Sequence, residues 1–288
     1  MSELNDIEQE MHAVDTMVEL TSVFEGIASM KIARIKNQVL QATKFFNDLW
    51  AIYTQLRVDS LFRFGRGEND ENVVDKELFI IITAEGGFSG DIDQKLMNWM
   101  LKSYDPDKTD IVVIGHHGAV MLAQKGISFK KYFKLPENDQ NINPEPIIKY
   151  VTQYKNTSVF YQQYISLMVQ DVKRIELSTA VAAIGQKSAT KDEVISEANY
   201  IFEPSTYAVV GHLERSMLKI AMSQLILDSK LAQYASRFRA MSASHQAADD
   251  QLGDVKLHYS RTKRGIKDER LKEIINGLKK AKAVAGGN

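Results

Sequence analysis

The sequence predicts an α/β protein in which a long antiparallel coiled coil of N- and C-terminal helices flanks a central Rossmann-like α/β domain. Near both ends of the 288-residue chain, apolar residues recur in alternating steps of four and three, the 3.5-residue period of a coiled coil. Between these stretches, short β-branched segments alternate with helical ones, an order that favours a parallel sheet with crossover connections. We therefore expect the first helix in residues 1–57, the α/β domain in 58–203 and the second helix in 204–288.

The N-terminal helix is expected to begin near Ser2 or Asn5, where a polar residue precedes acidic side chains in the opening turns. It should end near Leu56, because the polar stretch at 65–72 indicates an exposed loop. We call the residues on the 3.5-residue repeat the seam. In this helix the seam includes Ile7, Met11, Val14, Val18, Thr21, Ile35, Phe46 and Leu49.

The central segment predicts two buried strands, each followed by a helix. Residues 78–83 and 111–115 are short, apolar and β-branched, as strands of a covered parallel sheet are. Three prolines mark 135–146 as a loop. The remaining elements are expected as helices at 91–104, 118–125 and 147–165, a strand at 174–182 and a polar turn at 185–191.

The C-terminal helix is expected to begin after Pro204, a common start signal, and to end near Lys282. Polar and short residues interrupt its seam, which suits an antiparallel intramolecular pair better than a homodimeric zipper. The seam of this helix includes Leu213, Met217, Gln224, Leu227, Leu231, Phe238, Met241, His245, Ala248, Leu252, Val255, Tyr259, Thr262 and Ile266.

The second helix is longer than the first, so its end should overhang as a single helix. At about 1.5 Å per residue the two helices measure roughly 80 Å and roughly 115 Å. Pairing Leu56 with Ser205 places Ser2 beside Tyr259 and leaves 260–282 overhanging, a segment rich in Lys and Arg. Because isolated helices are marginal in water, this end either has a partner that covers it or frays into solvent. Its apolar residues are Leu271, Ile274, Ile275 and Leu278.

The composition favours a soluble cytoplasmic protein. A net charge of −1 gives no general attraction to nucleic acid or anionic lipid, so no nucleic-acid partner is expected. The absence of cysteine excludes disulfides and thiolate chemistry. The longest apolar run, 78–82, is too short to cross a bilayer, and the acidic N-terminus lacks a signal-peptide core. Membrane association is therefore expected only through partners.

Several features could carry chemistry, and in each a structural role is the stronger interpretation. The turn at 86–91 follows a strand and opens a helix, but it lacks the spacing of a phosphate-binding loop. His116 and His117 have no acidic or Cys partner at metal-ligand spacing, and Ser89 has no recognisable triad. His245 lies on the seam, which favours a core or register role. The sequence thus predicts no catalytic residue, no cofactor and no metal site.

Short motifs at both ends and in the middle of the chain match one known family. Residues 82–90 spell ITAEGGFSG, against I-T-S-D-R-G-L-C-G in that family, and 200–204 spell YIFEP, against Y-x-[FY]-E-P. Leu20-Thr21 precedes Lys31-Ile32, against I-T-x(9)-K-L, and 259–277 align without gaps to Y-N-K-A-R-Q…L-T-E-I-V-x-G. In these matches, and in the order of its parts, the chain resembles the gamma subunit of F-type ATP synthases.

The resemblance implies a rotor without an active site of its own. In this family the helical pair is the central shaft inside a hexamer of alpha and beta subunits, and the α/β domain contacts the epsilon subunit and the membrane ring of c subunits. The shaft couples ion-driven rotation of that ring to ATP synthesis or hydrolysis on the beta subunits. The overhang then lies within the hexamer, and contacts with a beta-subunit loop fall on Lys263, Arg264, Lys267 and Asp268.

Departures from the family pattern indicate a divergent or alternate branch. The family's opening turns are usually basic, whereas Glu8, Gln9 and Glu10 stand here. In the rotor role the chain is expected at the cytoplasmic face of the cell membrane, as a peripheral protein. The alternative is a coiled-coil scaffold or adaptor whose α/β head binds another partner. A third possibility is a Rossmann-like enzyme with a helical dimerisation arm, which requires a ligand at 86–91.

Overall fold

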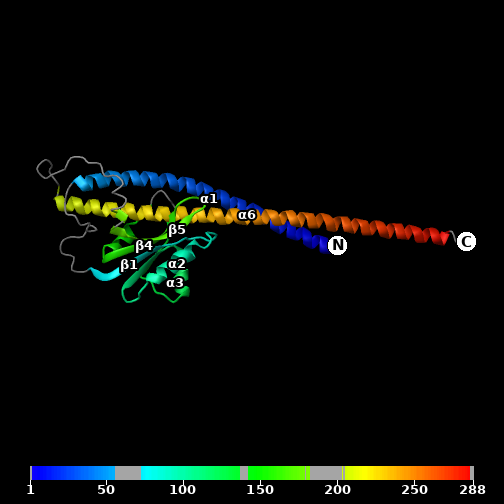
Figure 1. The fold of residues 1–288 in the computed structure, drawn as a ribbon, viewed down its shortest axis with the longest axis horizontal. Coiled ribbons are helices and arrows are strands. Elements are labelled where there is room, and N and C mark those ends of the chain that lie inside the picture. Colours follow the sequence, from blue (N-terminus) through cyan, green and yellow to red (C-terminus); the bar gives the residue numbers. More distant parts are fainter. Residues whose placement is uncertain are drawn as a thin grey trace. The chain divides into compact units, whose positions relative to one another are not determined.

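A computed structural model describes residues 2–55, 73–136, 142–178, 180–181, 203 and 205–285. The chain forms two compact units, Ile27–Ala240 and a second made of Met1–Gly26 with Met241–Asn288. Two long helices, α1 (Ser2–Gln55) and α6 (Thr206–Ala285), contribute to both units (Figure 1). The predicted fold class is confirmed: long terminal helices flank an α/β domain. The expected features at 65–72 and 185–191 lie outside the described residues.

The unit Ile27–Ala240 contains a five-stranded sheet in the order β3-β2-β1-β4-β5. β1 runs parallel to both β2 and β4, and β3 runs parallel to β2, as the alternation of strands and helices predicts. β5 pairs antiparallel with β4. The strands are β1 (Val74–Ile82), β2 (Thr109–Ile114), β3 (Lys131–Phe133), β4 (Tyr154–Tyr164) and β5 (Gln170–Glu176).

The helix expected at 147–165 is wrong. A short helix, α4 (Glu145–Val151), ends where that helix should have continued, and β4 follows it. β4 carries Thr157, Val159, Phe160 and Tyr161, β-branched and aromatic residues that pack well on a pleated surface, and it lies between β1 and β5. The strand expected at 174–182 overlaps only the end of β5, because the chain is already helical at 177.

Alternate residues of the strands face opposite sides of the sheet and build two cores. Leu78, Ile80 and Ile82 of β1 pack into one core with Phe46 of α1 and with residues of α6. The intervening residues of β1 pack on the other side against two helices, α2 (Ile92–Ser103) and α3 (His116–Gln124). In this unit α1 and α6 therefore cover one face and α2 and α3 the other (Figure 1).

The end of β1 meets the start of α3 at a close backbone approach. Gly115 has φ +100°, and a Cβ placed there would lie 2.0 Å from the carbonyl oxygen of Thr83. The Thr83 hydroxyl accepts a hydrogen bond from the Gly118 N–H at 2.9 Å. Glycine is therefore required at 115, and the contact fixes the turn that leads from β1 to α2.

Candidate partner-binding surface

The second unit is a two-helix coiled coil that continues as a single helix. On α1, Ile7 and Val14 are buried; on α6, the buried residues Met241, Ala248 and Leu252 follow the 3.5-residue repeat. A polar contact lies among these apolar layers at His245. Its Nδ1 is 3.4 Å from the hydroxyl of Thr21 and 3.2 Å from the carbonyl oxygen of Val18. Such a polar contact at one seam position helps to define the axial register of the two helices.

The contact between Thr21 and His245 locates the end of the paired region. Ser2 lies 19 residues before Thr21, so an antiparallel pair places Ser2 beside Arg264, 19 residues after His245. This is five residues beyond Tyr259, the position expected from the sequence. The exposure of the side chains agrees with this end of the paired region, because Ile266 is half-buried and all of 267–280 is exposed. The overhang therefore begins at Lys267.

The overhang presents an unpaired apolar stripe. Leu271, Ile274, Ile275 and Leu278 recur at the spacing of one helix face, and each has between 46% and 61% of its surface exposed. Apolar residues on one face of a single helix are the usual mark of a helix that binds into an apolar groove or sleeve. In this unit, nothing in the described chain covers the stripe.

The predicted contact residues lie where the paired region ends. Lys263, Arg264, Lys267 and Asp268 are all exposed on α6. The ammonium nitrogen of Lys263 lies 5.2 Å from the ring centre of Tyr259 and 3.5 Å from its hydroxyl, one helical turn away. The other three side chains project from the helix around the first turn of the overhang. The group is thus accessible to a partner.

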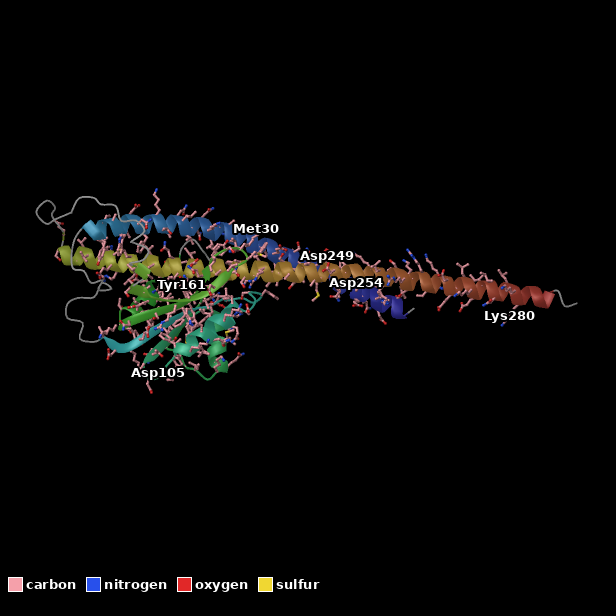
Figure 2. All side chains as sticks on the ribbon, in the orientation of Figure 1. Met30, Asp105, Tyr161, Asp249, Asp254 and Lys280 are labelled. Carbon is pink, nitrogen blue, oxygen red and sulfur yellow. The ribbon has the colours of Figure 1, made fainter. Side chains whose placement is uncertain are left out.

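Charge divides sharply along this unit. The paired stretches 2–26 and 241–255 contain ten acidic residues and neither Lys nor Arg, whereas most charged residues after 255 are basic. Figure 2 shows Asp249 and Asp254 on the paired part of α6 and Lys280 near its C-terminal end. The basic end can be predicted from the sequence, whereas the acidic part cannot, because two separate acidic stretches become one surface only when the helices pair. The acidic residues are Glu3, Asp6, Glu8, Glu10, Asp15, Glu19, Glu25, Asp249, Asp250 and Asp254.

The other predicted seam residues are buried or half-buried. In the unit Ile27–Ala240, Ile35 of α1 forms one buried cluster with Leu227 and Leu231 of α6, and Phe46 belongs to the core beneath the sheet. Phe238 is half-buried there. In the second unit Leu252 is buried and Val18 is half-buried.

The residues that could take part in binding or catalysis have partners within the protein. Arg237 of α6 donates to the carbonyl oxygens of Gly86 and Gly87, so a side chain of the protein occupies the turn at 86–91. His117 lies 3.0 Å from the carboxylate of Asp93, a partner that no local spacing in the sequence indicates. Within the described residues, no group of three His, Cys, Asp or Glu side chains could hold a metal ion. None of the described helices is long and apolar enough to cross a membrane.

Comparisons with known proteins show similarity to ATP synthase proteins over nearly the full length of the chain. The family model for ATP synthase matches residues 3–280. The ATP synthase gamma chain of Mycoplasmoides gallisepticum is 23% identical over 97% of this chain and 100% of its own length, and that of Cytophaga hutchinsonii is 20% identical over 96% and 98%. A chain of the Euglena gracilis mitochondrial ATP synthase has a similar fold, with a TM-score of 0.63 at 13% identity over 96% of this chain and 94% of that one. Since the family model covers almost every residue, the chain belongs to the ATP synthase family.

Proposed function

We propose that this chain is the central rotor shaft, the gamma subunit, of an F-type ATP synthase. Its partners are the hexamer of alpha and beta subunits, the epsilon subunit and the ring of c subunits. The chain couples rotation of the ring to ATP synthesis or hydrolysis, and the ATP chemistry takes place on the beta subunits. One observation carries the proposal: a paired coiled coil continues as a single helix with an exposed apolar stripe, in a chain that matches gamma chains from end to end.

The exposed apolar stripe of the overhang fits a partner that covers a single helix. Residues Lys267 to Ala285 would extend for about 28 Å at 1.5 Å per residue. A lone helix of this length is marginal in water, and its exposed leucines and isoleucines gain stability only when they leave water. The central opening of a hexamer offers such an environment from all sides at once. This is why a shaft fits the geometry better than an adaptor that binds a partner through its α/β head.

The contact with the beta subunit falls at the start of the overhang. Lys263, Arg264, Lys267 and Asp268 engage a loop of a beta subunit there, with the planar guanidinium of Arg264 suited to a carboxylate of that loop. The seam residues Val18, Ile35, Phe46, Leu227, Leu231, Phe238 and Leu252 hold the two helices of the shaft together. In this role the chain lies at the cytoplasmic face of the cell membrane and is held there by its partners.

The test is purification of the tagged chain from the native membrane fraction, followed by native mass spectrometry of what accompanies it. We expect three alpha and three beta subunits for each copy of this chain. A matched variant truncated after Ile266 keeps every buried seam residue and lacks only the exposed overhang, so it should recover less of the hexamer. Recovery of a monomer or a homodimer without ATP synthase subunits would overturn the proposal and favour the scaffold or adaptor.

A further inference from the structure

A row of polar residues on α6 is buried against the α/β domain. Ser229, Lys230, Gln233 and Ser236 are each at most 4% exposed. The turns of α6 that precede them pack on the sheet through apolar residues instead, such as Met222 and Ile226. Burying a polar group costs free energy unless it is hydrogen-bonded, so each of these side chains needs a partner. All four have one in the structure.

The first contact point is Gln162, the buried amide of β4. Its Oε1 accepts hydrogen bonds from the Ser229 hydroxyl and, at 3.3 Å, from the Gln233 amide nitrogen. Its Nε2 donates to the carboxylate of Asp93 at 2.6 Å. That carboxylate also accepts the backbone N–H of Ala84. A continuous hydrogen-bonded path therefore runs from α6 through β4 to the start of α2.

The second contact point is the turn between β1 and α2. The Ser236 hydroxyl donates to the carbonyl oxygen of Ser89 at 2.7 Å, and Arg237 donates to those of Gly87 and Gly86, each at 3.1 Å. Two residues of this turn, Phe88 and Gly90, have positive φ, so its carbonyls are held in a conformation that few residues adopt. The side chains of α6 therefore donate hydrogen bonds to a turn whose backbone conformation is fixed.

The third contact point lies after β3. The ammonium group of Lys230 donates to the carbonyl oxygen of Pro136 at 2.6 Å. Together the contacts occupy 229–237, about 12 Å along the axis of α6. They join one helix face to three separate segments of the α/β domain. We call Ser229, Lys230, Gln233, Ser236 and Arg237, with Gln162 on β4 as the partner of Ser229 and Gln233, the α6 lock.

We propose that the α6 lock transmits torque from the α/β domain to the shaft; this rests on the proposed rotor function. Apolar packing resists separation of α6 from the sheet, but the hydrophobic effect itself is non-directional. Hydrogen bonds lose strength steeply when their angle or length changes. A helix held by such bonds at three points cannot turn about its axis without breaking several buried contacts together. The lock also lies at the last turns of α6 within its unit, which ends at Ala240.

Stability alone does not account for the lock. Replacing a buried polar network by apolar residues of similar shape is often neutral for folding or stabilising. An apolar row at 229–237 would therefore have held α6 on the sheet equally well. Directional hydrogen bonds at separate points favour one rotational setting of the helix, and this is the property that a transmission element needs.

The test compares two variants in the assembled complex. The lock variant carries Ser229→Ala, Gln233→Met, Ser236→Ala and Arg237→Met. The control, Met222→Ala, removes apolar packing from the same helix–sheet interface and leaves every polar contact intact. ATP hydrolysis and ATP-driven ion pumping are measured in membrane vesicles. We expect the ions pumped per ATP to fall several-fold in the lock variant and to stay at the wild-type value in the control. An unchanged ratio in the lock variant, or an equal fall in both, would overturn the proposal.

A second measurement on the isolated chain separates failure of the lock from failure of the rotor assignment. The chain has no cysteine, so Asp105→Cys on the α/β domain and His212→Cys on α6 would be the only sites for spin labels. Pulsed electron resonance then gives the distribution of the distance between them. The lock predicts a broader distribution in the lock variant than in wild type or in Met222→Ala. Equal widths would refute the lock even if the chain purifies with the hexamer. A selective broadening in a chain that does not purify with the hexamer would leave the lock in place and reject the rotor.

Discussion

Leu231→Asp is the sharpest test of how α1 and α6 are held together in the unit Ile27–Ala240. Leu231 is 4% exposed and forms a buried cluster with Ile35 of α1 and Leu227 of α6. The partly buried residues that pack against this cluster are apolar or aromatic: Ile32, Val39, Ile142, Tyr164 and Tyr234. The substitution therefore puts a carboxylate where a fully packed leucine lay.

Two contributions set the expected loss in the free energy of unfolding. Removing a buried leucine side chain forfeits about 2–3 kcal/mol of hydrophobic stabilisation. Burying an unpaired carboxyl adds roughly 2 kcal/mol or more, even when the group avoids ionisation by raising its pKa. We expect a loss of about 4–5 kcal/mol in the free energy of unfolding. At about 2–4 °C per kcal/mol for a chain of this size, the melting temperature falls by about 8–20 °C.

The assay is thermal unfolding followed by the helical circular-dichroism signal. Leu271→Asp is the matched control, because it makes the same chemical change at a residue that is 56% exposed, and its effect should stay within about 0.5 kcal/mol. Lowering the pH should restore part of the stability of Leu231→Asp, since protonation removes the buried charge. If Leu231→Asp and Leu271→Asp melted together, the placement of Leu231 in a buried helix–helix cluster would be refuted.

Three further predictions concern the α/β domain and the shaft. The hydrogen bond that the protonated His117 ring donates to the Asp93 carboxylate raises the pKa of His117, so the stabilisation by this pair is complete below the ordinary histidine pKa and is lost as the pH rises through the raised value. His117→Asn should therefore lower the free energy of unfolding by about 0.5–1 kcal/mol at pH 6 and by less at pH 9, measured in urea. Burial raises the pKa of Asp228 to about 6, so stability is lost as the pH rises from the ordinary aspartate pKa to about 6 and the cost is complete above that value. Asp228→Asn should therefore stabilise the protein by about 2 kcal/mol at pH 8 and hardly at all near pH 4. In Gly115→Ala the added Cβ would lie 2.0 Å from a backbone oxygen, so the free energy of unfolding should fall by about 3 kcal/mol or more in melting experiments. In Gly265→Ala the added Cβ meets nothing within 4 Å on a helix, so the free energy of unfolding should rise by about 1 kcal/mol.

The sequence predicted the elements whose burial repeats along the chain. In the coiled-coil unit, burial follows one narrow stripe, so Met241, Ala248, Leu252 and Val255 are found at the predicted 3.5-residue spacing. The strands β1 and β2 were predicted because both faces of a covered parallel sheet are apolar. The comparisons confirm the resemblance to gamma subunits, which rested on the motifs at both ends and in the turn after β1.

The errors arose where the context of the fold decides the structure. β4 was mistaken for a helix because its residues carry no clean alternation: Val159 and Phe160 are both buried, on opposite faces of a sheet covered on both sides. Tyr161 of the same strand points to the α6 side (Figure 2). The five-residue error in the overhang came from matching the helix ends, since the register depends on the tertiary contact of Thr21 with His245. The partner of His117 could not be predicted, because Asp93 is 24 residues away in the sequence.

The distribution of polar residues on α6 shows how one helix meets two different mechanical demands. Where it adheres to the sheet, Met217, Leu218, Ala221 and Met222 are fully buried and supply non-directional adhesion. Where a load must pass from the domain into the helix, at the last turns before Ala240, the buried residues include a polar row whose hydrogen bonds are directional. In the second unit the buried residues of α6 are again apolar, with one polar contact at His245 that helps to define the register. A polar row at that location costs desolvation and adds little net stability. Its placement is explained if the orientation of α6 on the sheet is what the function requires.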